Sequence, residues 1–274
     1  MLSWRPSVDS RRFRTAATHY LPGRPAYPPA LIAEVARAAG LTGAHRLLDL
    51  GTGPGVLAIA FAPYVGSVLA VDPEPEMLRV AEEVVRKASL NVEVRAGSSL
   101  TIEPAWGRFR AVTLGRSFHW MDREETLRRL DLLIEPGGAV ILFDDRLADV
   151  PGNAGLRAWS EVVERYSADD RVRMERRSAE WQDHASVLRR SPFSSLEFHV
   201  LVHRSSTTVE VLIHRALSMS ATSAARLGDR TEPMLAEIRA TLAPFTERGE
   251  LAETIEWTAT LARRPDEVVA VRSG

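Results

Sequence analysis

The chain of 274 residues contains no cysteine, which excludes both a disulfide framework and a thiolate-ligated metal site. It also lacks any apolar run of the roughly 18 residues that a membrane-spanning helix needs. The first twenty residues, MLSWRPSVDSRRFRTAATHY, have no apolar core of the kind found in secretory signals. We therefore expect a cytoplasmic protein with no membrane partner.

The chain also has little excess charge and almost no lysine. Its formal net charge is −1, whereas a protein that binds a phosphate backbone needs a basic face, so we expect no nucleic-acid partner. Only one of the 35 basic residues, Lys87, is a lysine. Because arginine codons are rich in G and C, a high-GC genome explains this bias without a functional cause. The apolar fraction of 45% is that of an ordinary globular protein.

Short apolar runs alternate with helical patterns along most of the chain. Strand patterns occur at residues 47–50, 68–71, 92–94, 111–114, 139–143, 195–203 and 253–264. The first five are almost continuously apolar, which is typical of parallel strands buried on both faces. Helical spacing between them favours crossover connections. The sequence therefore predicts an α/β fold with a doubly wound, mostly parallel seven-stranded sheet and helices on both faces.

We expect one domain, residues 1–274, in four parts. An N-terminal segment and helix (1–46) precede a core (47–145), a charged helical insertion (146–190), and C-terminal strands and helices (191–274) that complete the sheet. Several prolines between Tyr20 and residue 29 disfavour a helix there and predict an extended turn.

The stretch LLDLGTGPG, residues 47–55, places three glycines directly after the first predicted strand. Ligands of doubly wound sheets bind at the carboxyl ends of the strands. The dinucleotide fingerprint requires glycine or alanine where this chain has Val56, which counts against NAD or NADP. Asp72 ends the second strand, where a carboxylate can accept hydrogen bonds from ribose hydroxyls. It could equally cap the following helix.

Five segments in order, LLDLGTGPG, VLAVDPEPEM, AGSSL, SFHWMD and EPGGAVILF, resemble the class I, Rossmann-like S-adenosylmethionine-dependent methyltransferases over about residues 20–145. The resemblance implies S-adenosylmethionine as cofactor and an antiparallel last strand at 253–264. It also implies an N-terminal lid within residues 1–46 and a cap formed by residues 146–190. The residues it assigns to cofactor binding are Tyr20, Arg24, Asp49, Gly51, Thr52, Gly53, Asp72, Pro73, Met77, Ser98, Ser99, Gly115 and Arg116.

Among these positions, Asp49 and the glycines match the methionine-binding loop of the family, and Asp72 matches its ribose-binding acid. Pro73 and Met77 fall where the family packs apolar groups on adenine. Ser98 stands where many members have an aspartate for the adenine amine, so a hydroxyl or the backbone would have to make that contact.

Methyl transfer requires in-line attack on the methyl carbon, so the enzyme mainly has to position the nucleophile and exclude water. A base is needed only for a hydroxyl or a protonated amine. His119 is the candidate base, because it follows the fourth strand and imidazole titrates near neutral pH, and His119 and Trp120 are candidate substrate contacts. Alternatively, His119 and Trp120 pack beneath the N-terminal segment. Trp159 and Tyr166 are candidate substrate contacts in the insertion, although their helical spacing also fits a core.

Two motifs that would narrow the acceptor are missing. The segment TLGRSFHW has neither the Asn/Asp-Pro-Pro-Tyr motif of enzymes that methylate nucleobases nor the metal-binding acid of catechol-type enzymes. His199 and His203 share one strand face but have no evident third ligand, so we expect no metal.

The sequence thus predicts methyl transfer to an oxygen or nitrogen atom of a small molecule, with a specialised metabolite as one candidate. The alternatives are an NAD(P)-dependent oxidoreductase and a non-enzymatic module that binds S-adenosylmethionine. Binding of S-adenosylmethionine but not NADPH would decide against the first. An enclosed acceptor pocket would decide against the second. The acceptor itself and the oligomeric state cannot be inferred from these motifs.

Overall fold

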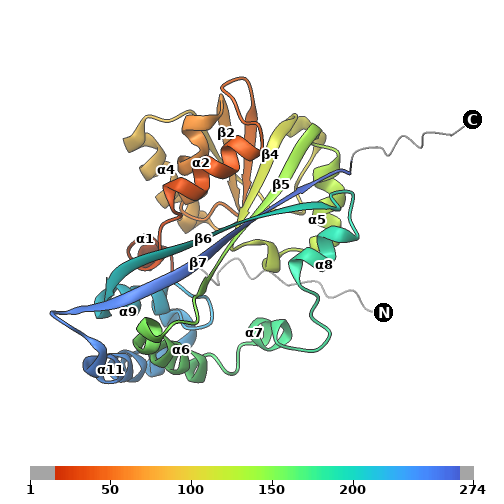
Figure 1. Cartoon of the computed structure of the whole chain (residues 1–274). Helices are drawn as coiled ribbons and strands as arrows, with labels where there is room; N and C mark the ends of the chain where they lie inside the picture. The colour runs from red at the N-terminus through yellow and green to blue at the C-terminus, as the bar shows by residue number, and fades with distance from the viewer. Residues whose placement is uncertain (1–15, 266–274) are drawn as a thin grey trace, which may run out of the picture.

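A computed structural model describes residues 16–265 and shows a single seven-stranded sheet in the order β3-β2-β1-β4-β5-β7-β6 (Figure 1). Its strands are β1 (Arg46–Leu50), β2 (Ser67–Asp72), β3 (Val92–Ala96), β4 (Phe109–Gly115), β5 (Ile134–Leu147), β6 (Ser195–Thr208) and β7 (Glu250–Arg263). Strands β1 to β5 pair in parallel, and β7 is antiparallel to both of its neighbours. The predicted fold class is confirmed.

Helices cover both faces of the sheet. The α-helices are α1 (Ala17–Gly23), α2 (Pro29–Ala38), α3 (Val56–Phe61), α4 (Pro75–Ala88), α5 (Arg123–Asp131), α6 (Ala154–Tyr166), α7 (Arg171–Arg176), α8 (His184–Arg189), α9 (Val209–Leu217), α10 (Ala224–Leu227) and α11 (Thr231–Leu242). Short 3₁₀ helices lie at Ala62–Tyr64, Pro104–Trp106, Phe118–Trp120, Pro151–Asn153, Gly228–Arg230 and Ala243–Phe245.

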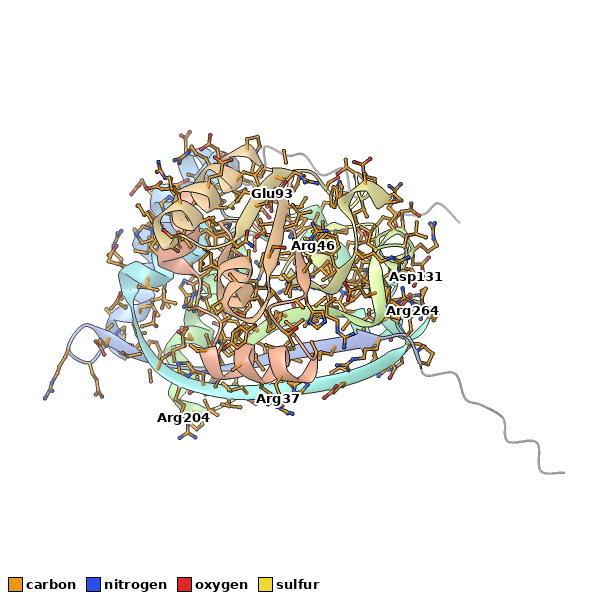
Figure 2. The ribbon with its side chains drawn as sticks, turned by 90° about the horizontal axis from the view of Figure 1, so that it is seen from above. Arg37, Arg46, Glu93, Asp131, Arg204 and Arg264 are labelled. Carbon is orange, nitrogen blue, oxygen red and sulfur yellow. The ribbon has the colours of Figure 1, made fainter. Side chains whose placement is uncertain are left out.

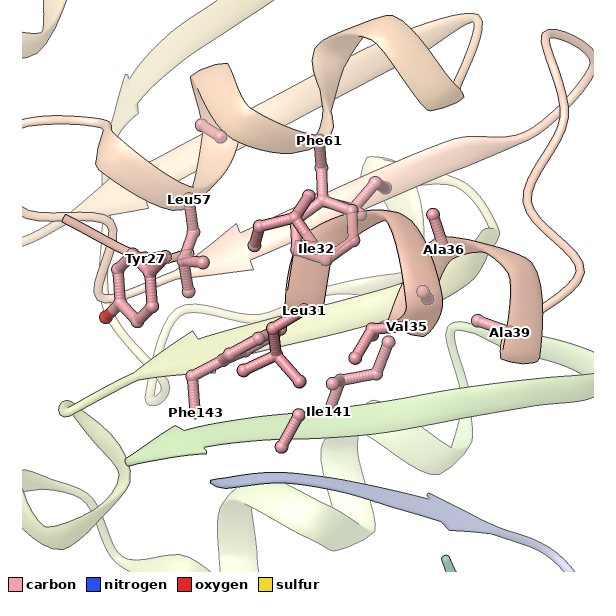
Figure 3. Packing of buried hydrophobic residues seen from close by; sticks show 14 of the residues in the cluster. Tyr27, Leu31, Ile32, Val35, Ala36, Ala39, Leu57, Phe61, Ile141 and Phe143 are labelled. Carbon is pink, nitrogen blue, oxygen red and sulfur yellow. The ribbon is translucent and has the colours of Figure 1, made fainter. Parts of the chain in front are cut away.

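The core on one face of the sheet lies between α2, α3 and the central strands. Leu31, Ile32 and Val35 of α2 face Ile141 and Phe143 of β5, as Figure 3 shows. Because α2 begins with Pro29, whose missing N–H would have no helical partner in any case, the helix starts without a lost hydrogen bond. The opposite face is covered by α5 and α8. The helices packed on the two faces of the sheet hold the carboxyl ends of its strands in place.

The long strands β5, β6 and β7 extend beyond the parallel part of the sheet, and each has 14 residues. Helices α6, α9 and α11 pack together at that extension and form a third apolar cluster with Leu251 of β7. Within the predicted insertion, β5 continues to Leu147 before the helices begin. Figure 1 shows α7 lying apart from the sheet, between α6 and α8.

Two local predictions were wrong. The proline-rich N-terminal segment contains a helix, α1, which includes Pro22. Pro22 is tolerated because the helix ends one residue later, so little of the hydrogen-bond ladder is lost. The fifth strand, predicted at residues 139–143, begins earlier, because β5 includes the segment EPGG, beside a register shift between Phe109 and Ala111. Residues 1–15 of the predicted N-terminal part lie outside the described residues.

Arg264, directly after β7, anchors the end of that strand to α5 through hydrogen bonds to the side chain and the backbone of Asp131. Arg264 donates from Nε to Oδ1 of Asp131 at 2.7 Å and from Nη2 to the Asp131 carbonyl at 2.7 Å (Figure 2). In the span 16–265, none of the helices is both long and apolar enough to cross a bilayer.

Candidate active site

A cavity of about 1070 Å³ opens at the carboxyl ends of β1, β2, β4 and β5. This is the edge of the sheet at which a doubly wound fold binds its ligands. The sequence-predicted residues that line it are Tyr20, Arg24, Gly51, Gly53, Asp72, Pro73, Met77, Ser98, Ser99, Gly115, Arg116, His119 and Trp120. Segments far apart in the chain therefore meet at one site.

The glycine loop after β1 needs glycine at three positions, because Gly51, Gly53 and Gly55 have φ angles of +72°, +55° and +82°. A Cβ on Gly51 would lie 2.6 Å from the Cβ of Ser117, so this backbone is also tightly packed. A Cβ on Gly53 would meet no heavy atom within 4 Å, and Gly53 lines the cavity. The loop thus presents bare backbone to a ligand.

Asp49 supports this loop from beneath. Its carboxylate accepts hydrogen bonds from Thr113 Oγ1 at 2.8 Å, from the Ala58 N–H at 3.1 Å and from the Thr52 hydroxyl. Burial raises the pKa of Asp49 to about 6, although these hydrogen bonds oppose the shift. Asp49 and Thr52 line a small recess beside Tyr20 and Gly51 and are not part of the wall of the large cavity.

Asp72 connects the end of β2 to the glycine loop. One carboxylate oxygen accepts from the Gly53 N–H at 2.8 Å, and the other accepts from the Glu74 N–H at 2.9 Å, where α4 begins. Burial raises the pKa of Asp72 to about 6. An ionised carboxylate has about four acceptor sites. Asp72 can therefore hold the loop, cap the turn before α4 and still accept hydrogen bonds from a diol.

The wall next to Asp72 combines apolar and hydroxyl groups. Pro73 and Met77 come from the start of α4, and Ser98 and Ser99 follow β3. The hydroxyl of Ser98 accepts a hydrogen bond from the Leu100 N–H at 3.2 Å and can still donate. This donor and acceptor set fits the ribose and the flat apolar base of a nucleoside.

Helix α1 brings Tyr20 and Arg24 to the opposite side of the loop. The Arg24 guanidinium lies 5.5 Å from the Tyr20 ring, and its Nε donates to Ser218 Oγ at 2.9 Å. Burial lowers the pKa of Arg24. Arg215 of α9 fixes α1 by donating from Nε to the Gly23 carbonyl at 2.9 Å. Tyr27 is packed between Phe143 and Trp257 and lies outside the wall of the large cavity.

Arg116 lies just after β4 in a left-handed conformation, with φ of +55°. Its Nε donates to the Tyr27 hydroxyl at 3.2 Å, and Nη1 lies 3.2 Å from Oδ1 of Asp145. Gly115 is tightly packed, since a Cβ there would lie 2.4 Å from the Tyr27 hydroxyl oxygen. Gly115 and Arg116 are thus held in place by Tyr27 and Asp145, and both line the cavity.

His119 lies in the 3₁₀ helix after β4 and is only 9% exposed. Burial lowers the pKa of His119 well below its usual value, and the positive charges of Arg176 and Arg24 add to the effect. The imidazole is therefore neutral near pH 7. It can exchange hydrogen bonds with a ligand, but it is a weaker base than the sequence suggests. Trp120 packs beside it, with ring centroids 4.9 Å apart.

Two predicted substrate contacts do not reach this cavity. Trp159 is buried in the cluster of α6, α9 and α11, where its Nε1 donates to the Leu212 carbonyl at 3.1 Å. Tyr166, about two helical turns further along α6, packs against the same cluster. Their spacing follows the apolar face of α6, which packs on helices and not over the sheet edge. The structure therefore corrects both assignments.

Sequence reasoning missed several residues that line the cavity. Asp144 and Asp145 directly follow the apolar core of β5, so two acids at a strand end were an available signal. Arg176 on α7 and residues 219–221 also line it, and no local pattern marks them. Tertiary packing alone brings these segments over the sheet edge.

A Rossmann-like sheet with an antiparallel last strand, a glycine loop after β1 and an acid at the end of β2 are the features that the resemblance to class I methyltransferases implies. The methyltransferase-domain family profile matches residues 47–138. An uncharacterized methyltransferase of Mycobacterium tuberculosis is 29% identical over 262 residues, covering 92% of this chain and 97% of the relative. An uncharacterized methyltransferase-like protein of Schizosaccharomyces pombe is 28% identical over 164 residues, which cover 59% of this chain and 61% of that relative.

Solved structures agree on the fold. A putative type II methyltransferase from Anaeromyxobacter dehalogenans superimposes with a TM-score of 0.55 at 20% identity, covering 88% of this chain and 97% of the other. An S-adenosylmethionine-dependent methyltransferase from Geobacter sulfurreducens, solved with S-adenosyl-L-homocysteine, gives 0.52 at 14% identity, covering 93% and 98%. The family profile, these relatives and the fold support an S-adenosylmethionine-dependent methyltransferase of class I, with S-adenosylmethionine as its cofactor. The oxidoreductase and non-enzymatic alternatives are therefore set aside.

Proposed function

We propose that the chain methylates an oxygen or nitrogen atom of a small molecule that binds in the cavity beside the cofactor. When bound, S-adenosylmethionine supplies an electrophilic methyl group on a sulfonium. The observation that supports a small acceptor is the size of the cavity: about 1070 Å³ is at the upper end of the roughly 300–1000 Å³ range of small-molecule pockets, which leaves room beside the cofactor for a small acceptor. His119 and α7 line the same cavity and are not among the residues that we assign to the cofactor.

For the cofactor, we assign the ribose hydroxyls to Asp72, and adenine to Pro73, Met77 and the Ser98–Ser99 turn. The backbone of the glycine loop and Gly115 would contact the methionine part, with Tyr20 closing over it. Arg24 would bind the methionine carboxylate, because it is a partly buried cation that makes no ion pair within residues 16–265. Asp49, Thr52 and Arg116 would keep these groups in place.

For catalysis, we propose that positioning dominates. Gly115, Arg116 and Ser117 line the cavity and are closely packed, so they would hold the acceptor at a fixed distance from the methyl group. His119 would hydrogen-bond the acceptor as a neutral imidazole. A strong base is required only if the attacking atom must lose a proton first.

Two variants test this assignment. Asp72→Asn should abolish or strongly weaken S-adenosylhomocysteine binding, measured by calorimetry. His119→Ala should lower methyl transfer from radiolabelled S-adenosylmethionine while S-adenosylhomocysteine affinity stays unchanged. Trp159→Phe, whose side chain lies outside the cavity, is the control for both assays. Unchanged turnover in His119→Ala would remove His119 from the acceptor site, and wild-type affinity in Asp72→Asn would refute the ribose assignment.

The remaining predictions from the sequence belong to the same proposal. We propose one domain over residues 1–274, with residues 146–190 as part of the wall over the acceptor; α7 lining the cavity supports this. A specialised metabolite as acceptor and a cytoplasmic location stay predictions from the sequence.

A further inference from the structure

Most charged side chains at the acceptor end of the cavity already have partners. Arg116 pairs with Asp145 at 3.2 Å. Arg173 donates to Ser167 Oγ at 2.6 Å, and Asp170 caps α7 by accepting from the Arg173 N–H at 3.0 Å. Two side chains of opposite charge differ from these, namely Asp144 and Arg176. Neither makes a hydrogen bond or an ion pair with any residue in the described part of the chain.

Asp144 lies in β5 directly after Phe143, where the pairing with β4 ends, and opposite Thr258 of β7. It lines the cavity and is partly buried. Burial raises the pKa of Asp144, and the neighbouring Asp145 raises it further, while Arg176 and Arg116 oppose the shift. A half-buried carboxylate without a hydrogen bond is costly unless something binds it.

Arg176 ends α7, which lies within the insertion (Figure 1), and this exposed residue lines the cavity. Partial desolvation lowers the pKa of Arg176, and the charge of Asp144 partly offsets this. The two side chains are thus close enough to affect each other, yet they do not reach ion-pair distance. Asp144 belongs to β5 of the sheet and Arg176 to α7 of the insertion, and both line the cavity.

We propose, on the basis of the function proposed above, that the methyl acceptor is a zwitterion of the amino-acid type. Asp144 binds its ammonium group, and Arg176 binds its carboxylate. A purely anionic acceptor would bring negative charge beside Asp144 and Asp145. A purely cationic acceptor would bring positive charge toward Arg176 and Arg24. A molecule with both charges gives each unpaired side chain a partner and places the acceptor beside His119.

The first test measures binding, not turnover. Aliphatic α-, β- and γ-amino acids are titrated into the protein saturated with S-adenosylhomocysteine, each beside its amide, which lacks the anion, and its des-amino acid, which lacks the cation. We expect at least one amino acid to bind tenfold or more tightly than both of its analogues. Transfer from radiolabelled S-adenosylmethionine to the same panel should follow the same order.

Two variants assign the charges. Asp144→Asn should lose the preference for the amino acid over its des-amino analogue, and Arg176→Gln should lose the preference over the amide. Arg177→Gln and Asp149→Asn, which change exposed neighbours outside the cavity, are the matched controls and should behave as wild type.

Three outcomes would overturn the inference. They are equal binding of all three compound types, no binding of any amino acid by a protein that binds S-adenosylhomocysteine, and an equal loss for every panel member in both variants. The last would show that the pair only holds the cap in place. Failure to bind S-adenosylhomocysteine would instead contradict the proposed function, and the inference would fall with it.

Discussion

Gly53 and Gly228 offer a matched pair of substitutions that separates backbone strain from ligand contact. Both glycines have φ of +55°, and a Cβ on either would meet no heavy atom within 4 Å. Only Gly53 lines the cavity. A positive φ of the left-handed type costs an L-residue about 1–2 kcal/mol, and Gly228 combines its positive φ with a ψ of −126°, a conformation that disfavours a side chain more strongly. Both Gly53→Ala and Gly228→Ala should therefore lower the free energy of unfolding, Gly228→Ala at least as much as Gly53→Ala, measured by urea denaturation.

Their S-adenosylhomocysteine affinities should differ. In Gly53→Ala the added methyl group occupies the open side of the glycine loop, where we place the cofactor. We expect at least tenfold weaker binding by calorimetry, which corresponds to about 1.4 kcal/mol. Gly228→Ala should bind as wild type. Equal affinities in the two variants would refute the assignment of the glycine loop to the cofactor.

Three further predictions concern charged groups. Because burial raises the pKa of Asp72 to about 6 and ribose hydroxyls need the ionised carboxylate as acceptor, S-adenosylhomocysteine affinity should fall as the pH is lowered through about 6; a pH-independent affinity would contradict this. Arg215→Met should cost about 3–5 kcal/mol of unfolding free energy because it leaves the buried carboxylate of Glu253 unpaired. The double variant Arg215→Met/Glu253→Met should recover most of that free energy in urea titrations. A double variant that loses as much as the two single variants together would argue against the pair. Because the pKa of His119 lies well below its usual value, its imidazole proton signals should not titrate by NMR between about pH 6 and 8, and a midpoint near 6.5 would show that the ring is solvated.

The first five strands could be predicted because they are almost continuously apolar, and such runs form buried strands in many packing environments. Their ends could not. Strand β5 continues to Leu147 because it pairs with β7, which is more than a hundred residues away in the sequence. Helix α1 was missed because Pro22 is a helix breaker in isolation, whereas here the helix packs on α9 and ends beside it.

The same distinction holds for the site. The cofactor wall could be predicted because the glycine loop and Asp72 are short motifs at strand ends. The acceptor wall could not, because Arg176 and residues 219–221 reach it only through the packing of separate helices. Trp159 was placed at the acceptor because an aromatic residue in an insertion suggests a pocket. Its position on the apolar stripe of α6 instead places it in the helical cluster.

The most direct test of the whole account is a crystal structure of the protein with S-adenosylhomocysteine. We predict that the ribose hydroxyls lie within hydrogen-bond distance of Asp72, that adenine contacts Met77, and that the sulfur faces Gly115 and the space between His119 and Asp144. Binding of the nucleoside elsewhere, or a sulfur that faces away from His119 and Asp144, would contradict it.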